Sequence, residues 1–223
     1  MRKILENALN KFRNGNFIVI YDDDKREGEA DLVFHPKFVT PEKIETLRKD
    51  AGGLICMAVG KTLAEQIGLR FISEIMKAYG MTRIICIKTA YGDEPAFSIA
   101  INHKRVFTGI TDNDRALTIR EFAKVVESVN KEHANKNANK KKEFEKNFYS
   151  PGHVFLLIGR GIENRRGHTE IGLKFSELAG MSETIVMCEM LGRGNALTKK
   201  QAMKYAKQNN IPFIKGSDIY GKK

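Results

Sequence analysis

A ten-residue stretch, Asp22 to Asp31, constrains this chain more than any other part of it. The stretch reads DDDKREGEAD and holds six carboxylates against two cations. Apolar runs flank it on both sides, FIVIY at 17–21 and LVF at 32–34. This pattern predicts two strands joined by a tight loop that directs its acidic side chains. Because carboxylates are costly to desolvate, the loop is either a solvated polar turn or a site that holds cations.

The chain length and the positions of the cysteines limit the class of protein. A chain of 223 residues suits one large domain better than two small ones, so we predict a single domain over residues 1–223. No apolar run approaches the ~20 residues that span a bilayer, and no signal-peptide core follows the N-terminus. The cysteines (Cys56, Cys86 and Cys188) lie far apart, which favours a reducing compartment over a disulfide scaffold or zinc ribbon. We expect a soluble cytoplasmic protein with no membrane partner.

The net charge of +11 has three explanations. A nucleic-acid binder would gather lysines and arginines on one face and interleave them with aromatic residues. An enzyme of phosphorylated metabolites would use a positive field to steer anions. The third explanation is a solvated surface with excess lysine. Much of the excess lies at 131–146 and 222–223 without interleaved aromatics, so we predict no nucleic-acid partner.

The order of the predicted elements indicates the fold class. The N-terminus is predicted as a helix with Ile4, Ala8, Leu9 and Phe12 on one face. Further helices are predicted at 41–50 with Thr40 as N-cap, at 62–69, from near Thr118, at 169–178 and from Thr198. Strands are predicted at 54–59, 83–88, 96–102, 154–158, 184–190 and 211–214. Residues 132–147, rich in lysine and asparagine, are predicted as an exposed connection. This mixture favours an α+β class, with a mixed sheet flanked by helices.

A second candidate site is RRGHTE at 165–170, where a helix is predicted to begin. Free backbone N–H groups and the helix dipole make such a start an anion site. Arg165 adds a bidentate phosphate donor, Gly167 permits close approach, and Thr169 adds a hydroxyl. His168 can coordinate a metal or transfer protons. The alternative is an ordinary helix cap with surface arginines.

Two further residues are candidates for proton transfer. His153 lies in Pro151-Gly152-His153, just before a predicted strand. Glu189 is an acid in an otherwise apolar strand, and a lone buried charge is costly unless it is paired or part of a site. The alternatives are a hydrogen-bonded turn histidine and a strand end that emerges into water.

Together and in this order, these segments resemble the 3,4-dihydroxy-2-butanone 4-phosphate synthase family of riboflavin biosynthesis. The resemblance is carried by DDDKREGEAD at 22–31, GGLIC at 52–56, FTGITDNDRALTI at 107–119, PGHVF at 151–155, RRGHTE at 165–170 and CEM at 188–190. These motifs span nearly the whole chain. They imply the stand-alone synthase rather than the form fused to a GTP cyclohydrolase.

The resemblance implies a lyase that converts D-ribulose 5-phosphate to L-3,4-dihydroxy-2-butanone 4-phosphate and formate. The implied path is a magnesium-assisted enolisation, dehydration, skeletal rearrangement and formate loss. Two Mg²⁺ ions are implied per active site, with Mn²⁺ as the alternative metal. The family also implies a cytoplasmic homodimer with its active sites at the subunit interface.

Carried over by motif, Glu27 and His168 are the implied metal ligands, and His153 and Glu189 the implied catalytic groups. The implied substrate-binding residues are Arg26, Glu27, Asp31, Arg165, Arg166, Gly167, His168, Thr169 and Glu189. The other loop acids (Asp22, Asp23, Asp24 and Glu29) receive no role, and Cys56 is expected to be a buried thiol.

Some segments depart from the family pattern. Residues 132–147 match no motif, residues 192–195 lack the acids expected in many relatives, and Leu156-Leu157 replaces a version with proline. None of these positions is an implied ligand, so they bear on loop geometry and dimer contacts. A catalytically dead relative is a further alternative, and the joint presence of Glu27, His153, His168 and Glu189 argues against it.

Overall fold

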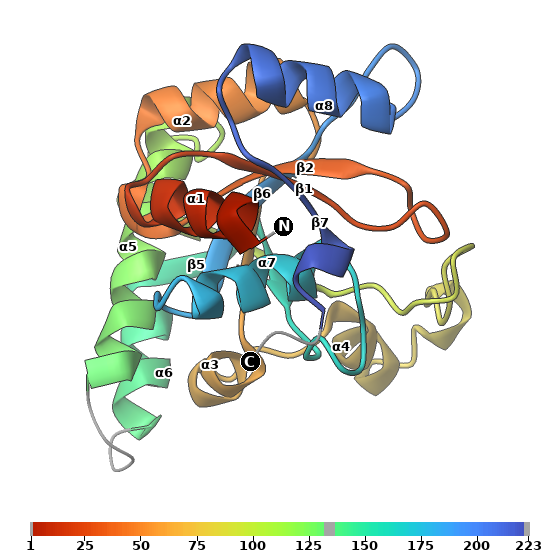
Figure 1. The fold of residues 1–223 in the computed structure, drawn as a ribbon. Coiled ribbons are helices and arrows are strands. Elements are labelled where there is room, and N and C mark those ends of the chain that lie inside the picture. The colour runs from red at the N-terminus through yellow and green to blue at the C-terminus, as the bar shows by residue number, and fades with distance from the viewer. Residues whose placement is uncertain (1, 132–136, 221–223) are drawn as a thin grey trace.

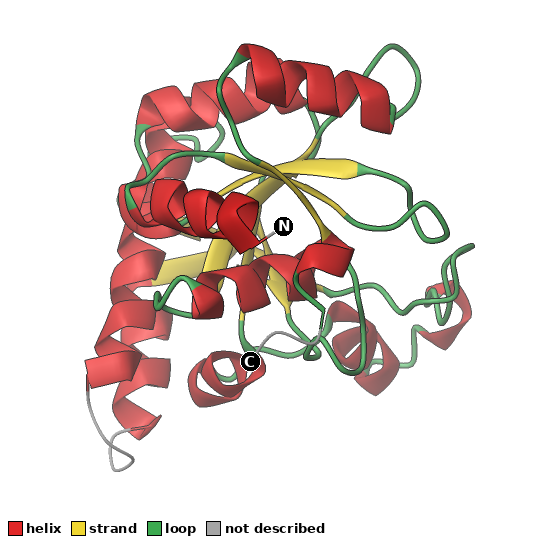
Figure 2. Ribbon diagram, in the orientation of Figure 1, coloured by secondary structure: helices red, strands yellow, loops and turns green. Residues whose placement is uncertain are grey.

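The computed structural model describes residues 2–131 and 137–220. Its strands form one seven-stranded mixed sheet in the order β4-β5-β3-β6-β2-β1-β7 (Figures 1 and 2). The strands are β1 Ile18–Tyr21, β2 Ala30–Phe34, β3 Cys56–Val59, β4 Phe97–His103, β5 Phe148–Ile158, β6 Thr184–Glu189 and β7 Phe213–Lys215. The pairs β1–β7 and β3–β5 are parallel, and the other neighbours are antiparallel. The predicted α+β class is confirmed.

Helices cover both faces of this sheet. The helices are α1 Arg2–Arg13, α2 Pro41–Thr46, α3 Lys61–Ile67, α4 Ile72–Ala78, α5 Asp112–Lys131, α6 Asn137–Asn147, α7 His168–Leu178 and α8 Lys199–Gln208. One apolar core joins a sheet face to α2, α3, α5, α6 and α8, and a second joins the opposite face to α1 and α7. Alternate residues of β1 enter the two cores, because successive side chains of a strand point to opposite faces.

The acidic stretch joins β1 to β2, as predicted. The two strands pair antiparallel from Ile18↔Val33 to Tyr21↔Ala30, so residues 22–29 form the connecting loop. Asp31, the last acid of the stretch, lies inside β2 opposite Glu189 of β6. The hairpin therefore carries one acid into the sheet and keeps the others in the loop.

Several helix predictions are confirmed in detail. Thr40 accepts a hydrogen bond from the backbone of Lys43 at the start of α2. Thr198 and Gln201 form the predicted capping box of α8. In α1, the expected apolar face is buried at Ala8 and Phe12, whereas Ile4 in the first turn is exposed.

The predicted strand at 83–88 is wrong. A short 3-10 helix occupies Thr82–Ile84, and Ile84 and Ile87 are exposed. The segment lies between α4 and β4 and pairs with no described strand. Because β propensity expresses side-chain packing on a sheet, an apolar run without a neighbouring strand does not become one.

The predicted helix start at Thr118 is also wrong. Helix α5 begins at Asp112, where the hydroxyl of Thr111 accepts from the backbone of Asp114 at 3.1 Å. Thr118 lies inside the helix, and its hydroxyl accepts from the backbone of His103 at 3.0 Å. Its capping-box spacing with Glu121 was therefore coincidental.

The connection predicted at 132–147 is a helix, α6, over its described part, and residues 132–136 lie outside the described residues. Phe144 of α6 is buried and stacks on Phe148 at a centroid distance of 5.4 Å. One aromatic anchor thus holds a lysine-rich segment to the core.

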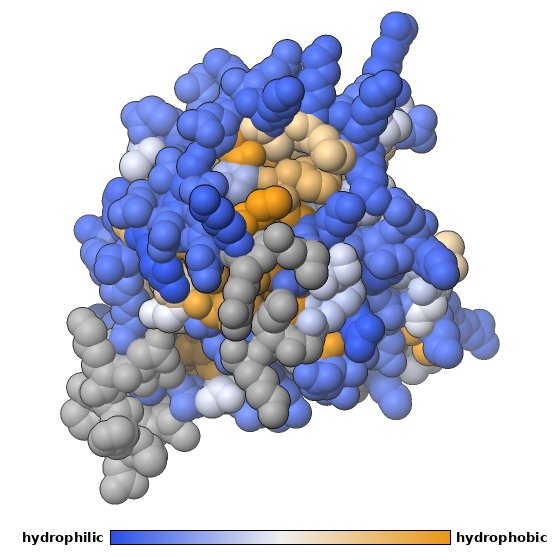
Figure 3. All heavy atoms as spheres, viewed as in Figure 1, coloured by the Kyte–Doolittle hydropathy of each residue, from blue (hydrophilic) through white to orange (hydrophobic). Residues whose placement is uncertain are grey.

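None of the described helices has the length and apolarity needed to span a bilayer. Figure 3 shows a face covered mainly by hydrophilic residues, with hydrophobic ones grouped beneath α8.

Candidate functional site

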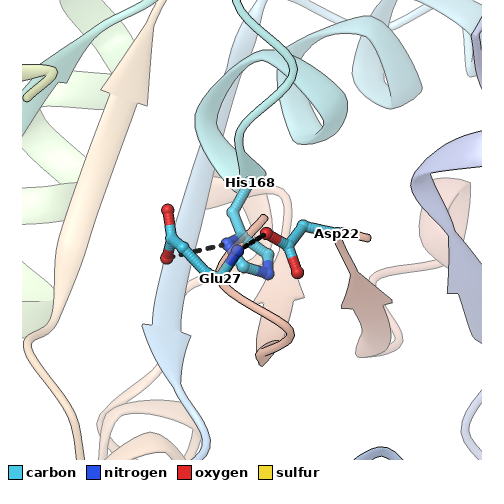
Figure 4. Close-up of side chains that lie close together, drawn as sticks. All are labelled: Asp22, Glu27 and His168. Atoms are coloured by element: carbon cyan, nitrogen blue, oxygen red, sulfur yellow. Dashed lines mark hydrogen bonds and ion pairs between the residues drawn. The ribbon is translucent and has the colours of Figure 1, made fainter. Parts of the chain in front are cut away.

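The candidate site lies where the loop of residues 22–29 meets the first turn of α7 and the adjacent ends of β2 and β6 (Figure 4). A cavity of about 180 Å³ opens there. Its lining residues are Glu27, Asp31, Thr89, Tyr91, Pro95, Ala96, Phe97, Leu157, Arg165, His168, Thr169, Met187 and Glu189. The structure thus brings together residues of the three segments DDDKREGEAD, RRGHTE and CEM.

Asp22, to which the sequence assigned no role, organises the acidic loop. Its buried carboxylate accepts hydrogen bonds from the backbone N–H groups of Glu27 at 3.0 Å and Glu29 at 3.1 Å. The same carboxylate accepts from Nη1 of Arg26 at 3.0 Å. The loop is therefore folded around Asp22, which directs Glu27 toward α7.

His168, the first residue of α7, is held in one tautomer. Its Nε2 lies 3.1 Å from the carbonyl oxygen of Glu29, and because a carbonyl only accepts, Nε2 must carry the proton. Nδ1 then faces Oε2 of Glu27 at 3.7 Å. Burial lowers the pKa of His168, but the nearby carboxylates, led by Asp31, outweigh it and raise that pKa above 6.5.

Asp31 and Glu189 are carboxylates of neighbouring strands. Both oxygens of Asp31 are buried without a hydrogen-bond partner among the described residues. Burial raises the pKa of Asp31, and His168 opposes that rise. Oε2 of Glu189 accepts from the backbone of Leu54 at 2.8 Å, and a Cβ at position 53 would overlap this carboxylate. Gly53 is thus needed for Glu189 to reach its place.

The donor set fits a hard divalent cation. One ligand atom from each of Asp22, Glu27 and His168 lies within 4.8 Å of the others (Figure 4). Carboxylate oxygens are the ligands that magnesium prefers, and a ligating histidine usually donates its other N–H to a carbonyl, as His168 does. The carboxyl of Asp31 beside this cluster has no hydrogen-bond partner among the described residues, and a nearby cation would stabilise its charged form.

Two partly unsatisfied arginines lie beside the acids. Arg26 and Arg165 are largely buried, and both contact Asp93, at 2.8 and 3.8 Å respectively. Arg165 also donates to Glu170 at 2.5 Å. Nη2 of Arg26 and Nε of Arg165 have no hydrogen-bond partner among the described residues. These two buried donors remain available to an anion beside Gly167, the N-cap of α7.

Sequence reasoning assigned no role to three residues that shape the site: Asp22, Asp93 and Glu170. Glu170 was visible as a member of RRGHTE, and Asp93 as an acid in a predicted loop. Neither position could be paired with an arginine until the fold was known.

Four predicted site residues lie outside the cavity lining: Arg26, His153, Arg166 and Gly167. Arg26 and Gly167 adjoin it beside Arg165. His153 is part-buried on β5, where the side-chain oxygen of Asn102 accepts from its backbone N–H at 2.9 Å. The amide nitrogen of Asn102 lies 3.1 Å from Nδ1 of the same ring. Arg166 is exposed, and its guanidinium lies 4.8 Å from the ring centre of Tyr220. Their predicted roles in catalysis and substrate binding stay predictions.

Comparisons with known proteins agree on one family. Residues 6–221 match the family model of 3,4-dihydroxy-2-butanone 4-phosphate synthase. The chain is 39% identical to the synthase of Archaeoglobus fulgidus, covering 96% of this chain and 91% of the relative. It is 36% identical to that of Methanothermobacter thermautotrophicus, covering 97% and 94%. A solved structure of the synthase in complex with two magnesium ions has a TM-score of 0.74 and 25% identity, covering 96% and 93%.

Proposed function

The chain belongs to the 3,4-dihydroxy-2-butanone 4-phosphate synthase family, lyases of riboflavin biosynthesis, and on that basis we propose that it converts D-ribulose 5-phosphate to L-3,4-dihydroxy-2-butanone 4-phosphate and formate. Residues 1–223 form one synthase domain in this proposal. The path runs through enolisation, dehydration, skeletal rearrangement and formate loss. These steps need charge stabilisation at neighbouring oxygens and groups that move protons.

Glu27 and His168 are the proposed magnesium ligands, with Asp22 as a further carboxylate within reach. Two ions per site are proposed, and Mn²⁺ is the alternative metal. When bound, magnesium supplies a Lewis acid that neutralises charge developing on the ketone and hydroxyl oxygens of the sugar. Asp22 holds the backbone of the loop so that Glu27 faces His168, and Glu29 holds the imidazole tautomer.

The substrate phosphate binds, in this proposal, at the start of α7. Arg26 and Arg165 offer their unpartnered donors to its oxygens, Gly167 lets it approach the backbone, and Thr169 adds a hydroxyl. Arg166 would join only by leaving Tyr220. Asp31 lies deeper in the cavity and is the proposed contact for the sugar hydroxyls.

Glu189 and His153 are the proposed groups that transfer protons. Glu189 lines the cavity, whereas His153 lies outside the cavity lining of its own chain. We therefore propose a homodimer in which His153 enters the site of the partner. Exposed apolar side chains lie next to both residues, Leu54 and Leu191 near Glu189 and Tyr149 near His153. A two-fold contact between these two patches would bury both at once.

The observation that carries the proposal is the cluster of Asp22, Glu27 and His168 beside the Arg26–Arg165 pair. It is tested by incubating the purified chain with ribulose 5-phosphate and magnesium and measuring formate. We expect formate release that EDTA abolishes and that added Mg²⁺ or Mn²⁺ restores. A chain that releases no formate, with or without EDTA, would exclude this function.

A further inference from the structure

The carboxylate of Asp93 occupies the space between the two arginines. Its Oδ2 lies 2.8 Å from Nε of Arg26 and 3.8 Å from Nε of Arg165. This carboxylate does not satisfy both arginines. Its 3.8 Å contact with Arg165 is too long for a hydrogen bond, and Nη2 of Arg26 has no hydrogen-bond partner among the described residues. A single carboxylate oxygen thus stands where a phosphate, with three terminal oxygens, would reach both guanidinium groups.

In the metal-free protein, the charges of the side chains around the arginine pair disfavour a further anion. Arg26 contacts the carboxylates of Asp22, Glu27 and Asp93, and Arg165 contacts Glu170 and Asp93. Two positive charges therefore face four negative ones. A phosphate monoester brings about −1.5 to −2 more at neutral pH. Of the four acids, Asp22 and Glu170 are fully buried and Glu27 belongs to the metal cluster, whereas Asp93 is 29% exposed and can leave toward solvent.

The turn that carries Asp93 is closed by its own hydrogen bonds. The N–H and the hydroxyl of Thr89 both donate to the carbonyl of Asp93, at 2.9 and 3.0 Å, and Gly92 closes the turn with a φ of 90°. Within the described residues, side chains tie this turn to the body. Asp93 contacts the arginines, and the ring of Tyr91 lies 4.6 Å from the guanidinium of Arg26. Glu94 pairs with Arg160 at 2.9 Å. Releasing these contacts costs no sheet or helix hydrogen bond.

We propose that Asp93 is an internal competitor for the substrate phosphate: its carboxylate holds the arginine pair in the free protein, and a phosphate dianion must displace it to bind. The proposal rests on the proposed function, because it takes Arg26 and Arg165 as the phosphate site. A dianion offers the arginines more charge and more acceptors than the carboxylate, whereas an uncharged sugar offers neither. Asp93 therefore selects for phosphorylated ligands, at the cost of lower apparent affinity.

The test is calorimetric titration of the full chain with inorganic phosphate, comparing wild type with Asp93→Asn and Asp93→Ala. If the competing contact is formed about nine-tenths of the time, removing its charge should tighten phosphate binding about tenfold. The matched control is Glu94→Gln in the same turn, since Glu94 pairs with Arg160 instead. It should leave the phosphate affinity unchanged. Thermal unfolding of each variant without phosphate verifies that it is folded.

Tighter phosphate binding in both Asp93 variants, with no change in the control, supports the proposal. Weaker binding would mean that Asp93 positions the arginines, and unchanged binding would mean that it does not compete; either result overturns the proposal. Formate release by the wild-type chain is measured separately. A chain that releases formate but whose Asp93 variants bind phosphate no more tightly keeps its function and loses only the competitor.

Discussion

His168 donates its Nε2 proton to the backbone carbonyl of Glu29 at 3.1 Å, so that Nδ1 faces the carboxylate of Glu27. The carbonyl belongs to the acidic loop and the imidazole to the first turn of α7. One hydrogen bond therefore sets both the position of the loop and the tautomer of the ring. A neutral imidazole held in this way presents Nδ1 as a metal ligand.

Replacing Glu27 with Gln should weaken magnesium binding by about 100-fold or more, because the amide is neutral and the cluster loses one of its charged donors. Calorimetric titration with Mg²⁺ measures the change. Asp24→Asn is the matched control, since Asp24 in the same loop pairs with Lys199 at 2.7 Å, away from His168. Equal losses in the two variants would show that the overall charge of the loop, rather than Glu27, binds the ion.

Magnesium affinity should rise with pH above 6.5. The carboxylates around His168 raise its pKa, so the metal-free folded protein holds a proton that a metal ligand must lose. Below the pKa of His168, each rise of one pH unit should increase the magnesium affinity by up to about tenfold. Above that pKa the ring is already neutral, so the affinity should increase less. Titrations in buffers of different ionisation enthalpy would count the proton released. Affinity that stays constant through this range would contradict the assignment of His168 as a ligand.

Two inactive variants should complement each other if His153 acts in the partner's site. His153→Ala and Glu189→Gln should each lack activity as homodimers. In a mixed dimer, one site receives Glu189 from the first variant and His153 from the second, and is intact. Random exchange of equal amounts should restore about a quarter of the wild-type activity. Formate release after mixing measures this, and no recovery despite verified exchange would place both residues in one chain's site.

Glu170→Gln should destabilise the fold by about 3 kcal/mol, because it leaves the buried guanidinium of Arg165 without its closest charge partner. Urea unfolding measures the loss. The control is Glu177→Gln on the same helix, whose exposed pair with Lys174 should contribute less than ~1 kcal/mol. A loss at Glu170 as small as that at Glu177 would mean that the pair is not buried in solution.

Acid should destabilise the protein through His35. Burial lowers the pKa of His35 from 6.5 to about 4, and its neutral ring accepts from the backbone of Lys37 and contacts the hydroxyl of Ser182 at 3.0 Å. The unfolded chain binds this proton more tightly, so the stabilisation is complete above pH 6.5 and is lost as the pH falls toward 4. The loss should total about 3 kcal/mol.

The difference between the unfolding free energies of wild type and His35→Gln, followed against pH, isolates this contribution from the other titrating groups. The difference should shrink through the same pH range. A difference that is independent of pH would mean that His35 is already accessible to protons in the folded protein.

Local patterns in the sequence correctly predicted features that depend on residues close together in the chain, such as a hairpin and a helix start. The apolar runs around Asp22 to Asp31 indicated a hairpin, and the capping box at Thr198 a helix start; both are confirmed. The run at 83–88 has the same apolar character but pairs with no described strand, and it forms an exposed segment that begins in a short 3-10 helix. Strand propensity is realised only where another strand is available to pair with it.

The sequence alone identified the segments that carry the candidate site residues, and the motifs in them resemble a single family. The tertiary structure decided which of these side chains lie next to one another. The order of the strands and the place where α7 begins set these neighbours. The sheet order sets Asp31 opposite Glu189, and the start of α7 brings Arg165 to Arg26 and Asp93. Such pairings join segments distant in the chain, and burial then gives them their strength by excluding water. The acidic stretch indicated a candidate site, and its tertiary contacts show that Asp22 also folds the loop and directs Glu27, the proposed metal ligand, toward His168.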